Sequence, residues 1–269
     1  FELVPDHLPE RLKDAVARFP AGSLQFEIGI QTFDPAVQAR ISRKQKNSVA
    51  EDNLRWLRAH AKAHLHVDLI AGLPGESLAS FAAGFDRLVA LQPHEIQFGI
   101  LKRLRGAPIA RHSQAFDLRF SADPPYSILS TRELDFSTLQ RMNRFARYWD
   151  IVANSGRYPR TLPWLLGDAP FDGFMAFADW LYAGTGQTHA LAHERLVHLL
   201  RDYLCERHAQ SAVDIERDLI EDYHASGGRS RLRFETEERR LPKPEVREAK
   251  SALPKRQARH LRGELGLPR

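Results

Sequence analysis

The stretch HLHVDLIAGLPGES, residues 64–77, carries the strongest fold signal in this chain of 269 residues. Apolar and polar residues alternate along residues 64–72, which is typical of a β-strand. The pattern breaks at the Gly72-Leu73-Pro74-Gly75 turn, and residues 77–91 have the spacing of a helix. We therefore expect a strand, a tight turn and a helix at this point in the chain.

Segments of the same two kinds alternate on both sides of this stretch. The patterns predict strands at 1–4, 24–30, 64–72 and 95–102, and helices at 8–19, 34–41, 48–62 and 77–91. Asp34 is the expected N-cap of the second helix, with Pro35 at its first position. Alternating strands and helices indicate parallel βαβ units, as in part of a β/α barrel or an open α/β sheet.

The pattern changes to helices alone after about residue 116. Helices are expected at 137–154, 171–183, 193–208 and 211–225. We therefore divide the chain into an α/β part at 1–115, a helical domain at 116–227 and a poorly ordered basic tail at 228–269. The segment from 229 to 269 holds 13 Lys and Arg against 6 Asp and Glu, a charge of +7, whereas the other residues sum to −2 and the whole chain to +5.

The composition is that of a globular protein with one cysteine, Cys205. A single cysteine excludes an internal disulfide framework and a cysteine-ligated cluster built from this chain alone, and it fits a reducing cytoplasm. No apolar run reaches the roughly 18 residues that span a bilayer, so we expect no membrane partner. Because the chain starts at Phe1 inside an apolar run, we expect a fragment of a longer protein.

Polar residues follow one face of the expected sheet. Side chains two apart on a strand share a face, and this groups Glu2, Glu27, Gln31, His66, Asp68 and Gln97. Parallel strands are normally buried on both faces, so polar residues on one face are unusual. We favour a polar ligand pocket at this face, and the alternative is a hydrogen-bonded polar network without a ligand.

Three features near this face have competing interpretations. His64, His66 and Asp68 share ligand-type side chains, but a closed zinc site requires four ligands, so we do not favour a metal. The GLPG turn lacks the lysine of a phosphate-binding loop and is better suited to lie against a flat base such as adenine. Arg43, in the loop SRKQK, suits a carboxylate or phosphate, although a solvated basic loop is the alternative.

Three segments together resemble the radical S-adenosylmethionine superfamily: EIGIQTFDPAVQARISRKQ (27–45), HVDLIAGLPGES (66–77) and EIQFGILKRLRGAPI (95–109). More narrowly, they look like its cobalamin-binding-domain type, and their order also resembles the oxygen-independent coproporphyrinogen dehydrogenase branch. Residues 124–144 look like the helical C-terminal extension of members with an N-terminal cobalamin domain. The resemblance implies an α/β fold, the C-terminal part of a partial β/α (TIM-like) barrel, followed by an all-helical region.

The resemblance also implies roles for individual residues toward S-adenosylmethionine. Gln31 would contact the ribose, Arg43 the carboxylate, and Asp68 the methionyl or ribose polar groups. Glu2 matches an acidic cofactor contact, and the backbone at Ile70 and Ala71 would support the adenine. The remaining polar residues of the face, Glu27, His66 and Gln97, are assigned to the substrate pocket.

The chain departs from the family by lacking its C-x3-C-x2-C cluster motif. The resemblance implies that the 4Fe-4S ligands lie outside this chain, which would then be inactive alone. The full-length enzyme would receive an electron from a donor protein and form a 5′-deoxyadenosyl radical. That radical would act in hydrogen abstraction or, with cobalamin, methyl transfer on an unknown small molecule or peptide. The alternative is a cluster-free nucleotide- or RNA-binding relative, although nucleic acid is not the favoured partner.

Overall fold

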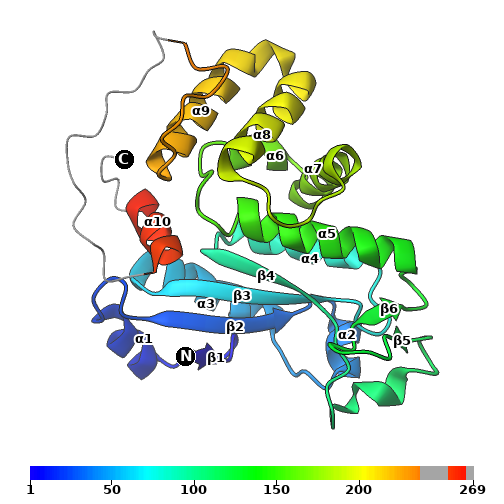
Figure 1. The fold of residues 1–269 in the computed structure, drawn as a ribbon. Helices are drawn as coiled ribbons and strands as arrows, with labels where there is room; N and C mark the ends of the chain where they lie inside the picture. Colours follow the sequence, from blue (N-terminus) through cyan, green and yellow to red (C-terminus); the bar gives the residue numbers. More distant parts are fainter. Residues whose placement is uncertain (237–253, 265–269) are drawn as a thin grey trace. The chain divides into compact units, whose positions relative to one another are not determined.

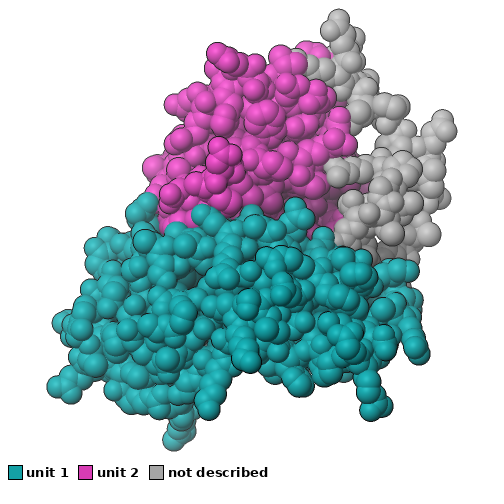
Figure 2. Space-filling model, turned by 180° about the vertical axis from the view of Figure 1, so that it is seen from behind, with its two compact units in different colours: residues 1–146 teal, residues 147–269 magenta. Residues whose placement is uncertain are grey.

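The computed structural model describes residues 1–236 and 254–264 of the chain. Two compact units divide it, residues 1–146 and residues 147–269, shown in separate colours in Figure 2. The first unit holds a parallel sheet with helices, and the second is helical. The expected order of an α/β part followed by a helical part is therefore confirmed.

Unit 1 is built on four parallel strands that lie side by side in chain order (Figure 1). They are β1 (Glu2–Leu3), β2 (Gln25–Gln31), β3 (His64–Ala71) and β4 (Glu95–Ile100). All four strands predicted from the sequence are present, and each pairs with the next in parallel register. Sequential parallel strands of this kind are the repeating unit of a β/α barrel.

Helices fill the connections between these strands. They are α1 (Glu10–Ala17), α2 (Pro35–Arg40), α3 (Asn47–His60) and α4 (Leu78–Ala90). The Asp34 side chain accepts hydrogen bonds from the backbone of Ala36 and Val37, which confirms the predicted N-cap. Ser77 caps α4 in the same way. Capping side chains satisfy helix N–H groups that have no partner within the helix.

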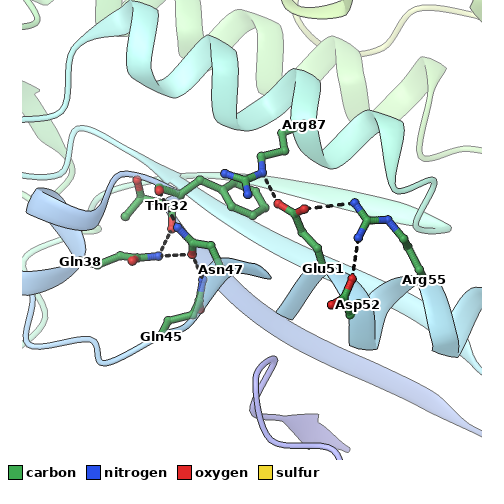
Figure 3. Close-up of polar contacts among 9 residues, drawn as sticks. Thr32, Gln38, Gln45, Asn47, Glu51, Asp52, Arg55 and Arg87 are labelled. Atoms are coloured by element: carbon green, nitrogen blue, oxygen red, sulfur yellow. Dashed lines mark hydrogen bonds and ion pairs between the residues drawn. The ribbon is translucent and has the colours of Figure 1, made fainter. Parts of the chain in front are cut away.

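One face of the sheet is apolar and covered by helices. Phe98 of β4 packs against Phe81 and Phe85 of α4, with ring centroids 4.6 and 6.4 Å apart. An ion pair between Glu51 of α3 and Arg87 of α4 joins the two helices (Figure 3). Burial of the branched and aromatic side chains on this face supplies the main stabilisation of unit 1.

The opposite face of the same sheet is polar and only partly covered. Its side chains are half-buried or exposed: Glu2, Glu27, Gly29, His66, Asp68, Ile70, Gln97 and Gly99. The apolar residues that alternate with them on β2 and β3 are buried. This asymmetry is unusual in a parallel sheet, whose two faces are normally both covered. The polar sheet face, as we call these residues, is therefore the place in unit 1 where a ligand or another part of a protein can bind.

The chain beyond β4 also belongs to unit 1. It forms η1 (Pro108–His112), the antiparallel pair β5 (Arg119–Phe120) and β6 (Ile128–Ser130), and most of α5 (Phe136–Val152). The Phe145 ring lies 5.1 Å from both Phe85 and Phe98. The boundary between the units therefore falls after Ala146, later than the 115/116 division expected from the sequence.

Unit 2 consists of helices. They are α6 (Leu162–Leu166), α7 (Pro170–Thr185), α8 (His193–Arg207), η2 (Ala209–Ser211) and α9 (Ala212–Ala225). Of these, α7, α8 and α9 match predicted positions closely, and α6 was not predicted. The aromatic face of α7 is buried, as its spacing predicts. Asp222 of α9 is 1% exposed and accepts hydrogen bonds from Thr161 N and Thr161 Oγ1, both at 2.9 Å.

A last helix, α10 (Lys255–Glu264), lies within the segment that we expected to be a poorly ordered basic tail. Arg256 pairs with Asp150 at 2.8 Å, and Arg259 Nε donates to the Ser155 carbonyl at 2.7 Å. Within the expected tail, residues 228–236 are also described, whereas residues 237–253 and 265–269 lie outside the described residues. Across the described ranges, none of the helices is long and apolar enough to cross a membrane.

Candidate functional site

The end of β2 carries an irregularity that sets the position of Gln31. The register with β3 shifts between Gly29 and Gln31, and Gln31 has a φ of 69°. A Cβ added at Gly29 would lie 2.4 Å from Gln31 Nε2 and 3.7 Å from Arg43 Nη2. The two predicted cofactor residues therefore meet over Gly29, which must lack a side chain to admit them.

Arg43 is held against the strand by hydrogen bonds to the chain. Its Nη2 donates to the Gly29 carbonyl, and its Nε donates to Gln45 Oε1 at 3.0 Å. Burial lowers the pKa of Arg43, and the charge of Asp6 partly opposes that shift. A half-buried, anchored guanidinium disfavours the alternative of a solvated basic loop. Its remaining N–H donors can bind a carboxylate or phosphate.

Four acidic or basic side chains of the polar sheet face lie close enough to interact. Glu2 pairs in register with Glu27, and Glu27 with His66. The pKa of Asp68 is raised, first because burial disfavours its charge. The neighbouring His66 lowers that pKa, whereas the carboxylates of Glu27 and Glu2 raise it. The structure therefore brings together the acidic residues that were grouped from strand parity alone.

Three of the predicted site residues have buried polar atoms without a partner in the chain. These atoms are Gln31 Oε1, His66 Nδ1 and Asp68 Oδ1. Buried polar atoms are nearly always hydrogen-bonded, because leaving one unpaired costs about 1–3 kcal/mol. Their placement on one face, next to an anchored arginine, indicates a site for a polar ligand.

The other predicted site residues lie around this centre. Gln97 is exposed and pairs in register with Asp68. Ile70 is half-buried on the polar sheet face, and its Cγ1 would lie 3.8 Å from a Cβ added at Gly99. Ala71 is fully buried, and its carbonyl accepts a hydrogen bond from Leu101 N at 2.9 Å. The adenine-supporting role of Ile70 and Ala71 remains a prediction.

The GLPG turn has the expected backbone conformation, and the chain packs closely against both of its glycines. Gly72 and Gly75 have φ of 88° and 78°, which glycine adopts readily. A Cβ at Gly72 would lie 2.6 Å from Ile128 Cγ2, and one at Gly75 would lie 2.9 Å from Phe116 and closer still to Arg40. The chain itself fills the space that a side chain at either glycine would need, so both positions require glycine, and the role of the turn toward adenine stays a prediction.

The two histidines of β3, His64 and His66, lie near the start of the strand but differ in burial and partners. His64 is buried, and its Nε2 lies 3.0 Å from Glu95 Oε1. Within residues 1–236 and 254–264, no group of three or more His, Cys, Asp and Glu side chains could hold a metal ion. Cys205 lies on α8 of unit 2. The described residues therefore do not fit a 4Fe-4S cluster, whose ligands are cysteine thiolates.

Sequence patterns missed one acidic residue at the same edge of the sheet. Glu76 is 2% exposed, and its Oε1 accepts a hydrogen bond from Thr32 Oγ1 at 2.5 Å, whereas its Oε2 is buried without a partner. Burial raises the pKa of Glu76 to about 7. The hydrogen bond from Thr32 opposes that shift, and Asp34 adds to it. Its position directly after the GLPG turn was the only signal in the sequence.

Comparison with protein families identifies the C-terminal half of the chain. Residues 114–261 match the family described as protein of unknown function (DUF4080), which is more than half of the chain. The chain belongs to the DUF4080 family. The match covers unit 2 and the end of unit 1, so it does not include the polar sheet face.

Curated relatives match shorter stretches of this DUF4080 protein. The oxygen-independent coproporphyrinogen III oxidase of Paracoccus denitrificans is 33% identical over 95 residues, which is 35% of this chain and 21% of the relative. The corresponding enzyme of Thermostichus vulcanus is 33% identical over 75 residues. The chain thus matches only about a fifth of the length of these relatives.

Two solved structures also overlap with the chain. Coproporphyrinogen III oxidase (HemN) from Escherichia coli, a radical S-adenosylmethionine enzyme, is 21% identical and covers 54% of this chain and 30% of its own, with a TM-score of 0.40. The radical S-adenosylmethionine methyltransferase TsrM from Kitasatospora setae is 18% identical, covers 40% of this chain and 21% of its own, and has a TM-score of 0.36. TM-scores below 0.5 do not establish a common fold, so the sequence matches carry more weight.

Proposed function

We propose that unit 1 supplies a binding wall for S-adenosylmethionine in a radical S-adenosylmethionine enzyme. The observation that carries this proposal is the set of unpartnered buried atoms, Gln31 Oε1, His66 Nδ1 and Asp68 Oδ1, beside an anchored Arg43. The partial identity with oxygen-independent coproporphyrinogen III oxidases supports it independently.

The polar groups of this wall suit the carboxylate and ammonium groups of the cofactor's amino-acid part and the hydroxyl groups of its ribose. Arg43 has N–H donors left for a carboxylate after its contacts with Gly29 and Gln45. Gln31 Oε1 and Asp68 Oδ1 are acceptors, which suit ribose hydroxyl or ammonium donors. A ligand that has a carboxylate together with hydroxyl or ammonium groups would bind the donors and the acceptors of this face at once.

The iron–sulfur cluster belongs to the proposal but not to this chain's residues. In radical S-adenosylmethionine enzymes the 4Fe-4S cluster supplies the electron that converts the cofactor to a 5′-deoxyadenosyl radical. Because the described residues do not fit a cluster, its ligands would lie outside this chain. The chain's own contribution is to bind and orient the cofactor. Cobalamin and the substrate remain predictions from the resemblance alone.

Saturation-transfer NMR with S-adenosylmethionine tests this proposal, because it detects even millimolar binding. We expect ribose and methionine signals with the wild-type chain, and at least tenfold weaker binding for Arg43→Ala, which loses a charge-assisted contact. Arg18→Ala is the matched control, since Arg18 is exposed on the C-terminal side of α1. Equal affinity of the Arg43→Ala and Arg18→Ala variants would contradict the proposal, as would no binding by the wild-type chain.

A cluster-free nucleotide-binding relative is the second candidate, favoured by the lack of cluster ligands among the described residues. Such a protein would need to bind its nucleotide tightly by itself. Isothermal titration calorimetry separates the two candidates, because micromolar affinity without any cluster supports the second. An RNA-binding role for the basic tail stays a prediction, since most of that segment lies outside the described residues.

A further inference from the structure

Three amide side chains, those of Gln38, Gln45 and Asn47, form a connected group (Figure 3). Asn47, the first residue of α3, accepts hydrogen bonds at Oδ1 from Gln38 Nε2 at 2.7 Å and from Gln45 Nε2 at 3.0 Å. Its own Nδ2 donates to the Phe33 carbonyl at 2.8 Å. All these residues lie in the segment from Phe33 to the first residue of α3, so this segment, which includes α2, is cross-linked through side-chain amides.

The amide group is connected to both predicted cofactor residues. Gln45 Oε1 accepts the hydrogen bond from Arg43 Nε at 3.0 Å. Gln38 is 3% exposed, and its Nε2 also donates to the carbonyl of Thr32 at 2.8 Å, directly after Gln31. One side of the group therefore holds the guanidinium, and the other side holds the backbone of the irregular turn at the end of β2.

The hydrogen bonds fix the orientation of each amide. Rotating the Gln45 amide by half a turn would point its NH2 group at Arg43 Nε and its oxygen at Asn47 Oδ1, so two hydrogen bonds would become two repulsive contacts. The same applies to Asn47, whose NH2 group faces the Phe33 carbonyl. Only a side chain that both donates and accepts can join Arg43 to Asn47 in this way, and glutamine has that property.

We propose that Gln45 is a positioning residue that preorganises the Arg43 guanidinium over Gly29. Its hydrogen bond restricts a long, flexible side chain before any ligand arrives, and preorganisation of this kind raises affinity by reducing the entropy lost on binding. The consequence for S-adenosylmethionine rests on the proposed function. The positioning of the guanidinium does not depend on that function.

The test combines two substitutions at Gln45 with a control. Gln45→Met keeps the length but removes both polar atoms. Gln45→Glu keeps an acceptor for Arg43 Nε and loses only the donor to Asn47. Gln210→Met is the matched control, because Gln210 is exposed in η2 of unit 2. Thermal unfolding verifies that each variant folds, and Gln45→Ala replaces Gln45→Met if that variant does not.

The first measurement is hydrogen exchange of the Arg43 Nε–H group by ¹⁵N NMR, with the signal assigned from its loss in Arg43→Ala. We expect slow exchange in the wild type, Gln45→Glu and Gln210→Met, and at least tenfold faster exchange in Gln45→Met. Unchanged exchange in Gln45→Met would overturn the proposal, because the guanidinium would then be held without this side chain.

The second measurement is affinity for S-adenosylmethionine. We expect binding three- to tenfold weaker for Gln45→Met and within about twofold of wild type for Gln45→Glu, because an acceptor for Arg43 is retained. A merely structural role would weaken both variants alike, and that result would overturn the inference. If the exchange data follow expectation but the wild-type chain does not bind the cofactor, the positioning stands and the proposed function fails.

Discussion

Two aspartates, the buried Asp222 of unit 2 and the half-buried Asp68 of unit 1, are in opposite situations. Asp222 of unit 2 accepts three hydrogen bonds at Oδ2, from Arg160 N at 3.1 Å and from Thr161 N and Oγ1 at 2.9 Å. Asp68 of unit 1 has a buried Oδ1 without a partner in the chain, and nearby carboxylates raise its pKa further. The Asp222 carboxylate therefore stabilises the fold of unit 2, whereas the Asp68 carboxylate has an oxygen that can accept a hydrogen bond from a ligand.

This difference separates structural from functional acidic residues without any family comparison. A satisfied carboxylate joins α9 to the turn before α6, so its charge is compensated by donors that folding itself provides. A carboxylate with an unpaired buried oxygen destabilises the ligand-free protein, and a ligand that donates a hydrogen bond to that oxygen removes the destabilisation. Substitution should therefore lower stability in one unit and lower ligand affinity in the other.

The largest expected effect is that of Asp222→Ala on the stability of unit 2. The variant leaves the N–H groups of Arg160 and Thr161 and the Thr161 hydroxyl without their acceptor in a buried place. We expect a loss of about 3 kcal/mol in the free energy of unfolding. Urea unfolding followed by tryptophan fluorescence measures it, because Trp149, Trp164 and Trp180 all lie in unit 2.

Asp214→Ala is the control for that measurement. Asp214 lies on the same helix and pairs only with exposed Arg217. We expect little change for this control, since exposed ion pairs contribute little. Equal stability of the Asp222→Ala variant and this control would contradict the claim that the Asp222 carboxylate stabilises unit 2.

Glu76 is expected to change the free energy of unfolding by a similar amount, in a way that depends on pH. Its pKa is raised from 4.5 to about 7 in the folded protein, so the folded state keeps a proton that the unfolded state releases. Stability from this group is complete below about pH 4.5 and is lost as the pH rises to about 7, by at most about 3 kcal/mol. Because glutamine does not titrate, this part of the change of stability with pH should disappear in the Glu76→Gln variant.

Urea unfolding of the wild type and Glu76→Gln at several pH values measures this difference. The stability of the variant relative to the wild type should rise between pH 4.5 and pH 7 and stay constant above it. Parallel stability curves across that window would show that Glu76 titrates normally, and would contradict its description as a buried, incompletely paired acid.

The smallest expected change in stability is that of Asp68→Ala, the matched counterpart of Asp222→Ala. Removing an unsatisfied carboxylate should change the free energy of unfolding by less than about 1 kcal/mol. The same substitution should abolish or strongly weaken the saturation-transfer signals of S-adenosylmethionine. A large loss of stability would instead indicate that Asp68 supports the fold, as Asp222 does.

The elements of unit 1 were predictable because their signals are local. Alternation places β2 and β3, and Asp34 followed by Pro35 marks the start of α2. Parity along the strands also groups Glu2, Glu27 and His66, whose charges all shift the pKa of Asp68. These features depend on residues only a few positions apart, so the sequence was sufficient for them.

Features that depend on distant residues were not predictable in the same way. The irregular turn at Gln31 depends on contacts of Thr32 with Glu76, 44 residues away in the sequence. Parity places Gln31 on the same face as Gly29, but it does not reveal the register shift and positive φ that bring the Gln31 amide directly over Gly29. The amide group around Asn47 likewise forms only when the loop closes on itself.

The packing of Ile128 over Gly72 sets the shortest piece of this protein that can be expected to fold. A chain cut at residue 115, where the strand pattern of the sequence ends, would lose Ile128 and leave the turn at Gly72 uncovered. It would also lose Phe145, which packs against Phe85 and Phe98. For recombinant work on the candidate site alone, residues 1–146 are therefore the better choice.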